Sequence, residues 1–87
     1  MSKGWQLVIH EPSMRMLLAA RAKDRAALFR VFDRLVASPY TKGSFTERDE
    51  AGRPIEVLLA KPWIIAYWPD SFVKELRIVR IEKIRLE

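Results

Sequence analysis

The fold of this chain is determined mainly by the stretch Arg53–Arg85, which reads RPIEVLLAKPWIIAYWPDSFVKELRIVRIEKIR. It holds three runs rich in β-branched and aromatic residues, which are separated by turn residues at Lys61-Pro62 and Pro69-Asp70. Such a series of runs and turns predicts an antiparallel β-meander. The middle run, Trp63–Trp68, is apolar throughout, which predicts a central strand covered on both faces.

One strand and two helices are predicted before the meander. A β-prone run at Trp5–His10 is ended by Glu11-Pro12, and proline in a first turn favours helix entry, so a short helix is predicted to Ala20. A second helix begins near Asp24 and ends at Ser38, because the residue before proline avoids the α region. Its apolar stripe recurs at helical spacing: Leu28, Val31, Phe32, Leu35 and Val36.

A weak strand at Ser44–Arg48 and a turn at Asp49–Gly52 lead into the meander. In the last strand the alternation becomes irregular at Val79–Ile81, which indicates a bulge or a strong twist. The predicted order is therefore β-α-α-β-β-β-β, an α+β two-layer fold in a single domain of residues 1–87. The helices are expected to cover one face of the sheet, so that a site lies on the other face or its rim.

The composition narrows the classes of function. With no cysteine, a disulfide framework and a thiolate metal site are excluded. With a single histidine, His10, an imidazole zinc site is not expected, and no cofactor is expected either. The longest uncharged apolar run, Trp63–Trp68, is too short to cross a bilayer, and the N-terminus lacks the apolar region of a signal peptide. We therefore expect a cytoplasmic protein without a membrane partner.

The charge points to a polyanionic partner. The net charge is +5 and the pI is about 10.0. Residues 1–43 hold eight lysines and arginines against three acids, whereas residues 44–87 hold eight of each sign. The surplus therefore belongs to the predicted helices, where it forms either a solvated helix face or a docking surface for RNA backbone.

The order and spacing of these elements resemble the RelE/ParE superfamily, the toxins of bacterial type II toxin–antitoxin pairs. Four segments carry the resemblance: the strand end and helix start at Ile9–Pro12, the helix end at Leu35–Tyr40, the aromatic-x-hydrophobic-x-Tyr pattern of Trp63–Tyr67, and the closing strand Leu76–Arg85. The resemblance covers most of the chain.

The resemblance implies a ribosome-dependent endonuclease that cuts messenger RNA without metal and is neutralised by an antitoxin. The RNA 2′-hydroxyl attacks the adjacent phosphate in such a reaction, which requires proton transfer and cations at the phosphate. Mapped onto this chain, the catalytic candidates are Arg80 and Lys83. The candidates for binding RNA phosphate are Arg48, Arg53, Arg77 and Arg85.

Other residues carry less specific expectations. Ile64, Ala66 and Trp68 share the face away from the predicted helices, so Ile64 and Trp68 are expected in an open apolar surface for the antitoxin or a second copy. Glu56 is expected to pair with Arg77 or Arg80 across the strands. His10 is expected to be structural or exposed.

Two alternatives follow from departures from the family pattern. Ile64 stands where many members have arginine, and Glu82 and Lys83 stand where relatives often have glycine and histidine. The first alternative is a non-catalytic interaction module of the same fold, which could form a dimer. The second is a toxin directed at gyrase.

Overall fold

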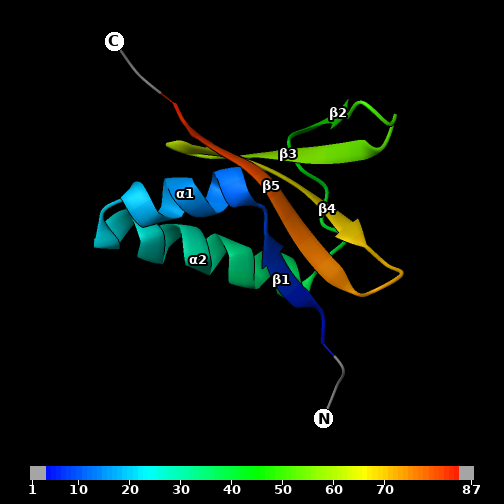
Figure 1. Ribbon diagram of the computed structural model, residues 1–87, viewed down its shortest axis with the longest axis horizontal. Helices are drawn as coiled ribbons and strands as arrows, with labels where there is room; N and C mark the ends of the chain where they lie inside the picture. Colours follow the sequence, from blue (N-terminus) through cyan, green and yellow to red (C-terminus); the bar gives the residue numbers. More distant parts are fainter. Residues whose placement is uncertain (1–3, 85–87) are drawn as a thin grey trace.

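The computed structural model describes residues 4–84, and its element order confirms the predicted β-α-α-β-β-β-β arrangement. Both helices lie against one face of the sheet, and the opposite face is called the outer face below (Figure 1). No helix in this part of the chain is long and apolar enough to cross a membrane. The elements are β1 (Gln6–Ile9), α1 (Glu11–Ala19), α2 (Ala22–Ala37), β2 (Phe45–Arg48), β3 (Pro54–Ala60), β4 (Trp63–Asp70) and β5 (Glu75–Lys83).

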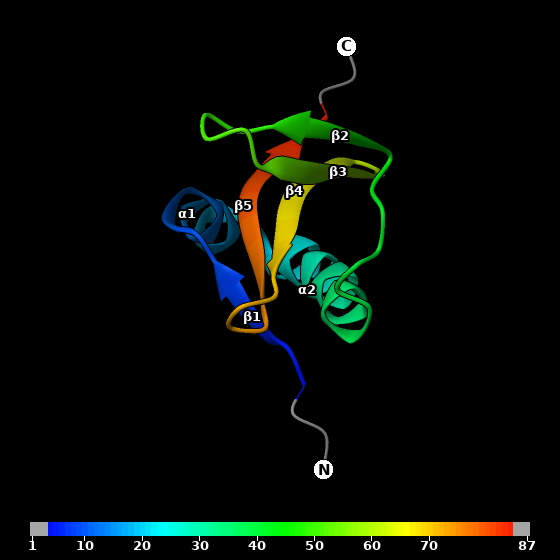
Figure 2. The ribbon, with the colours of Figure 1, turned by 90° about the vertical axis from the view of Figure 1, so that its right-hand side faces the viewer.

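The five strands form one mixed sheet in the order β1-β5-β4-β3-β2. Strands β2 to β5 pair as the predicted antiparallel meander, and β4 is the central strand. β1 pairs with β5 in parallel, with Ile9 opposite Ile78. The β2–β3 hairpin runs across β4 and β5 at one end of the strongly twisted sheet (Figure 2). The parallel pairing of β1 with β5 brings the N-terminal strand beside the last strand of the chain.

A bulge in β5 accounts for the irregular alternation seen in the sequence. Ala66 pairs with Arg80 but Tyr67 pairs with Ile78, so Val79 is the extra residue. Because of this insertion, Ile78 and Ile81 both pack toward the helices, while Val79 packs with the apolar cluster on the outer face. The bulge therefore directs Arg80 outward.

The main core lies between the helices and the sheet. Side chains of both helices meet those of β4 and β5, and its largest fully buried members are Tyr67, Phe32, Leu17, Leu28 and Ile65. The Tyr67 hydroxyl donates to the carbonyl oxygen of Thr41 at 2.9 Å. Burial, with the nearby Glu56 carboxylate as a smaller cause, raises the pKa of Tyr67 to about 12. Tyr67 is thus a core residue that ties the α2–β2 loop to the sheet.

Two local predictions were wrong. Pro69 and Asp70 do not form the turn but continue β4, and the turn follows at residues 71–74, where Lys74 has a φ of 56°. Pro69 fits in the strand because β3 pairs with β4 only as far as Tyr67, so this end of β4 has an open edge. Glu56 lies opposite Tyr67, with Gly43 N donating to its carboxylate at 2.8 Å, and it pairs with neither predicted arginine.

Candidate functional site

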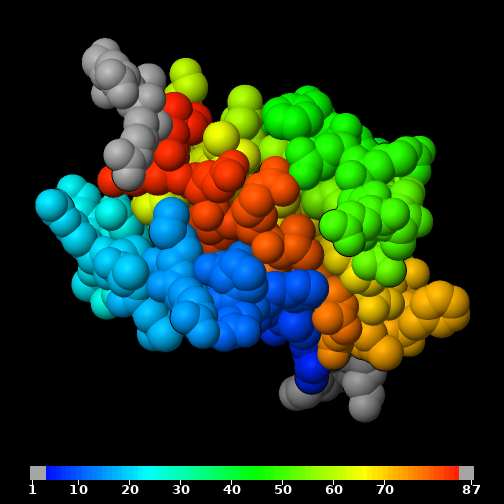
Figure 3. Space-filling view, turned by 45° about the horizontal axis from the view of Figure 1, so that its top comes forward, coloured from blue at the N-terminus to red at the C-terminus, as the bar shows by residue number. Residues whose placement is uncertain are grey.

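The outer face carries a hollow of about 450 Å³ between the β2–β3 hairpin and β5. Figure 3 shows the hairpin beside β5 on this side of the molecule. Three of the arginines predicted from the sequence, Arg48, Arg53 and Arg80, line the hollow together with Trp68. The meander assembles them because β2, β3 and β5 each contribute one side of the hollow. The other polar residues that line it are His10, Glu47, Asp49 and Glu50.

Arg80 and Glu47 form the central ion pair of the hollow. Arg80 Nη1 donates to Glu47 Oε2 at 2.9 Å, and Arg80 Nε lies 3.7 Å from the Glu82 carboxylate. The hydrogen bond from Arg80 lowers the pKa of the Glu47 carboxyl, and the same bond raises the pKa of Arg80. Both groups are therefore charged at neutral pH, and Glu47 holds the guanidinium in place. Glu47 was not predicted as a site residue from the sequence, because nothing local links β2 to β5.

His10 reaches the same hollow from the other end of the chain. It occupies the N-cap position of α1, and its backbone N–H donates to the Ile78 carbonyl at 2.9 Å. Its Nε2 lies 3.5 Å from Arg77 Nη1. Burial and, secondarily, the positive charge of Arg77 lower the pKa of the imidazole. His10 is therefore uncharged at neutral pH and able to accept a proton.

Trp68 is half-buried beneath arginine side chains. The Arg53 guanidinium carbon lies 4.1 Å from the centre of the indole ring, and that of Arg77 lies 5.7 Å away. Arg53 also pairs with Asp49 at 3.4 Å. A nucleic-acid base that stacks on Trp68 must displace Arg53 from the ring.

The cations in and beside the hollow are balanced by nearby acids. Arg77 does not line the hollow, and it pairs with Asp70 at 3.3 Å and with Glu75 at 2.7 Å. Arg48 donates to the Gly52 carbonyl at 2.7 Å. Three arginines and three carboxylates line the hollow, so it has no surplus of positive charge.

Lys83 lies apart from Arg80. Lys83 lies opposite Trp63 in the β4–β5 register, and its Nζ lies 5.5 Å from the centre of the Trp63 ring, on the helix side of the sheet. Positions 80 and 83 point to opposite faces of β5, so the two side chains cannot hold one phosphate together. Arg85 lies outside the described residues.

The apolar outer surface is smaller than expected. Ile55, Val57 and Ala66 are buried there, while Ile64 and Trp68 are only half-buried around them. Two members of this cluster, Ile55 and Val57, belong to β3 of the β2–β3 hairpin. Ile64 and Trp68 are therefore not part of an open apolar sheet face.

Within residues 4–84, no cluster of three or more His, Asp or Glu side chains has a spacing suited to a metal ion. The ionisable groups that line the hollow are one imidazole, three guanidinium groups and three carboxylates.

The fold matches solved RelE structures. The sequence itself matches no protein-family model and no curated protein sequence. The archaeal RelE–RelB complex from Pyrococcus horikoshii OT3 gives a TM-score of 0.72 at 11% identity, covering 92% of this chain and 94% of that one. The isolated E. coli RelE toxin gives 0.69 at 10% identity, covering 95% and 87%. The intact E. coli RelBE toxin–antitoxin complex gives 0.64 at 9% identity, covering 94% and 99%. The chain thus has a RelE-like fold.

Proposed function

We propose that this protein is the cytoplasmic toxin of a type II toxin–antitoxin pair and that it cleaves messenger RNA on the ribosome without a metal ion. The RelE-like fold supports the toxin assignment. Two of the similar structures are complexes of RelE with RelB, which supports an antitoxin as the partner.

The observation that carries the proposal is the Arg80–Glu47 pair in a hollow that His10 also lines. The neutral imidazole of His10 accepts the proton of the RNA 2′-hydroxyl while the 2′-oxygen bonds to phosphorus. The bond from phosphorus to the 5′-oxygen then breaks, and that oxygen takes the proton back from the imidazolium. Arg80 stabilises the charge on the phosphate, and Glu47 keeps the guanidinium in position.

Ribosome dependence is consistent with the charge balance of the hollow. A site with equal numbers of arginines and carboxylates concentrates free RNA poorly, because phosphate binding depends on unpaired cations. A ribosome holds the message in place and so supplies the substrate that the hollow alone attracts weakly.

The same charge balance favours a second candidate, a non-catalytic interaction module of this fold. Arg53, Arg77 and Arg80 each pair with a carboxylate, as residues of a purely structural surface would. In this case the protein binds its partner and leaves messages intact.

Induced expression in bacteria that lack the partner separates the candidates. We expect growth arrest with cleavage of translated messages, relieved by His10→Gln and by Arg80→Ala. Arg15→Ala serves as the control, because Arg15 is exposed on α1 and pairs only with Glu11 in the described chain. Normal growth with abundant soluble protein would support the non-catalytic interaction module. Growth arrest with DNA damage and intact messages would indicate a gyrase-directed toxin.

A further inference from the structure

A groove on the helix side of the molecule is separate from the hollow on the outer face. It runs along α2 and past the β3–β4 turn, with Ala27, Val31, Pro62 and Trp63 among its lining residues. Val31 is half-buried and Trp63 is 5% exposed, so the groove has an apolar floor. A neighbouring depression at the α1–α2 turn shares Trp63 and continues it past Lys83.

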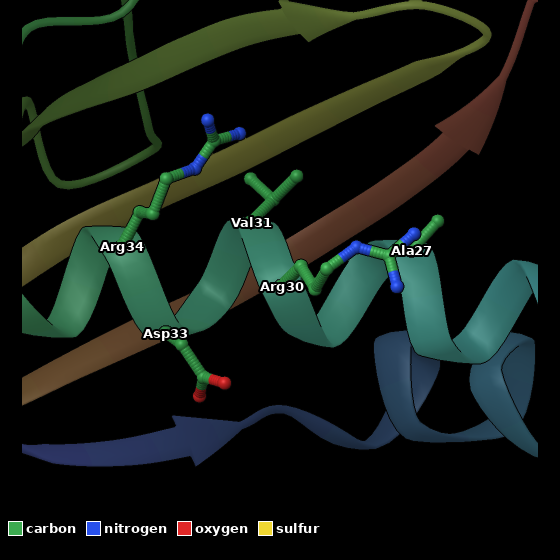
Figure 4. A pocket seen from close by; sticks show the side chains of 5 residues that line it. All are labelled: Ala27, Arg30, Val31, Asp33 and Arg34. Carbon is green, nitrogen blue, oxygen red and sulfur yellow. The ribbon is translucent and has the colours of Figure 1, made fainter.

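Exposed cations line this groove and its continuation. Figure 4 shows Arg34 and Val31 pointing toward the strands, while Asp33 points to the opposite side of α2. Six lysines and arginines line the two depressions against two carboxylates, Asp24 and Asp33, which leaves a surplus of four positive charges. The six are Arg21, Lys23, Arg30, Arg34, Lys61 and Lys83.

These cations differ from Arg53, Arg77 and Arg80 in their pairing. Within residues 4–84, none of the six forms an ion pair, whereas Arg53, Arg77 and Arg80 are all paired. The surplus of four makes up most of the net charge of +5. Six cations that form no ion pair within residues 4–84 thus lie around an apolar groove, where they attract an acidic partner.

The apolar floor distinguishes between two kinds of acidic partner. An RNA backbone engages cations but gains little from alanine, valine and proline side chains. Base stacking on Trp63 is restricted, because that ring is almost fully buried and has Lys83 over it. An amphipathic helix with acidic flanks can place apolar side chains against the floor of the groove and carboxylates beside the cations that line it.

We propose that this groove binds an acidic amphipathic helix of a partner protein. The helix places its apolar side chains against Val31 and Pro62, and its carboxylates meet Arg30, Arg34 and Lys61. The proposal does not depend on RNA cleavage, and a partner bound here leaves the hollow on the outer face open.

A synthetic helix of about 18 residues tests the proposal, since this length spans the face of α2. The probe carries Leu at positions i, i+3, i+4 and i+7 and Glu elsewhere. We expect binding by fluorescence anisotropy, with changes in amide chemical shifts confined to α2 and the β3–β4 turn. Arg30→Glu with Arg34→Glu should weaken binding at least ~10-fold, because two attractive contacts become repulsive.

Matched controls make the outcome decisive. Arg48→Glu with Arg53→Glu introduces the same change in charge on the outer face and should alter peptide affinity by no more than ~2-fold. A peptide of identical composition with its leucines scattered around the helix should bind weakly. Circular dichroism confirms that each variant is folded. The proposal fails if the amphipathic peptide does not bind, if both double variants weaken it equally, or if single-stranded RNA shifts the same amides with higher affinity.

Discussion

His10 lies at the end of β1, where burial and the charge of Arg77 lower the pKa of its imidazole. The unfolded chain therefore binds a proton at His10 more readily than the folded chain does. The contribution of this residue to stability is complete above its unfolded pKa of about 6.5 and falls as the pH drops through the range below it. The same property keeps the imidazole available as a base at neutral pH.

A pH-dependent unfolding experiment checks the state of His10. Between pH 7.5 and pH 5.5, the free energy of unfolding in urea should fall more for the native sequence than for His10→Gln, because only the native chain gains a proton at this position on unfolding. Equal losses in the two proteins would show that His10 titrates with an ordinary pKa.

The Tyr67 hydroxyl provides a second test at the residue scale. Tyr67→Phe removes the hydrogen bond to the Thr41 carbonyl and leaves that loop without this anchor. We expect a loss of about 1 kcal/mol in the free energy of unfolding. Tyr40→Phe is the control, since Tyr40 is 64% exposed and packs edge-on against Trp5 through its ring. A cost no larger than that of the control would contradict the assigned anchor role.

At the element scale, the loop from α2 to β2 packs closely against β3. A Cβ added at Gly43 would lie 2.5 Å from the Val57 carbonyl oxygen, while one at Gly4 meets nothing within 4 Å. Gly43→Ala should therefore cost about 1–3 kcal/mol through backbone displacement, and Gly4→Ala should be nearly neutral. Thermal unfolding of both variants measures the difference. Similar transition temperatures would mean that the loop is held more loosely against β3 than the structure shows.

Local sequence patterns predicted most of the elements and failed where distant segments meet. The stripe on α2 and the turn at Asp49–Gly52 were predicted from short-range signals, as was an irregularity at Val79–Ile81, where a bulge or a strong twist was expected and a bulge is found. The parallel pairing of β1 with β5 leaves no local signal, since parallel strands are joined by a long crossover. His10 was consequently not placed beside Arg77.

At the scale of the whole molecule, charge is divided between two faces. On the outer face Arg53, Arg77 and Arg80 are paired with carboxylates, whereas the six cations along the groove on the helix side form no ion pair within the described residues. The sequence indicated this division, because the surplus lies in residues 1–43. It did not indicate that Lys61 and Lys83 join the helix cations, because that depends on how the strands pack behind α2.

The candidate site was predictable in part. Arg48, Arg53 and Arg80 were assigned from the family resemblance, and the structure brings them to one hollow. Glu47 completes the site through a contact that spans the sheet from β2 to β5. Lys83 is not part of the site, because alternate residues of a strand point to opposite faces of the sheet.

Primer extension on a message translated in a reconstituted reaction shows whether the protein cleaves messenger RNA on the ribosome. We expect the native chain to cut the ribosome-bound message and to leave the free message intact. His10→Gln and Arg80→Ala should each slow cleavage at least ~10²-fold, because one removes the base and the other the cation at the phosphate. Arg15→Ala should cut at the native rate. Intact translated messages with the native chain, or undiminished cleavage by Arg80→Ala, would contradict this expectation.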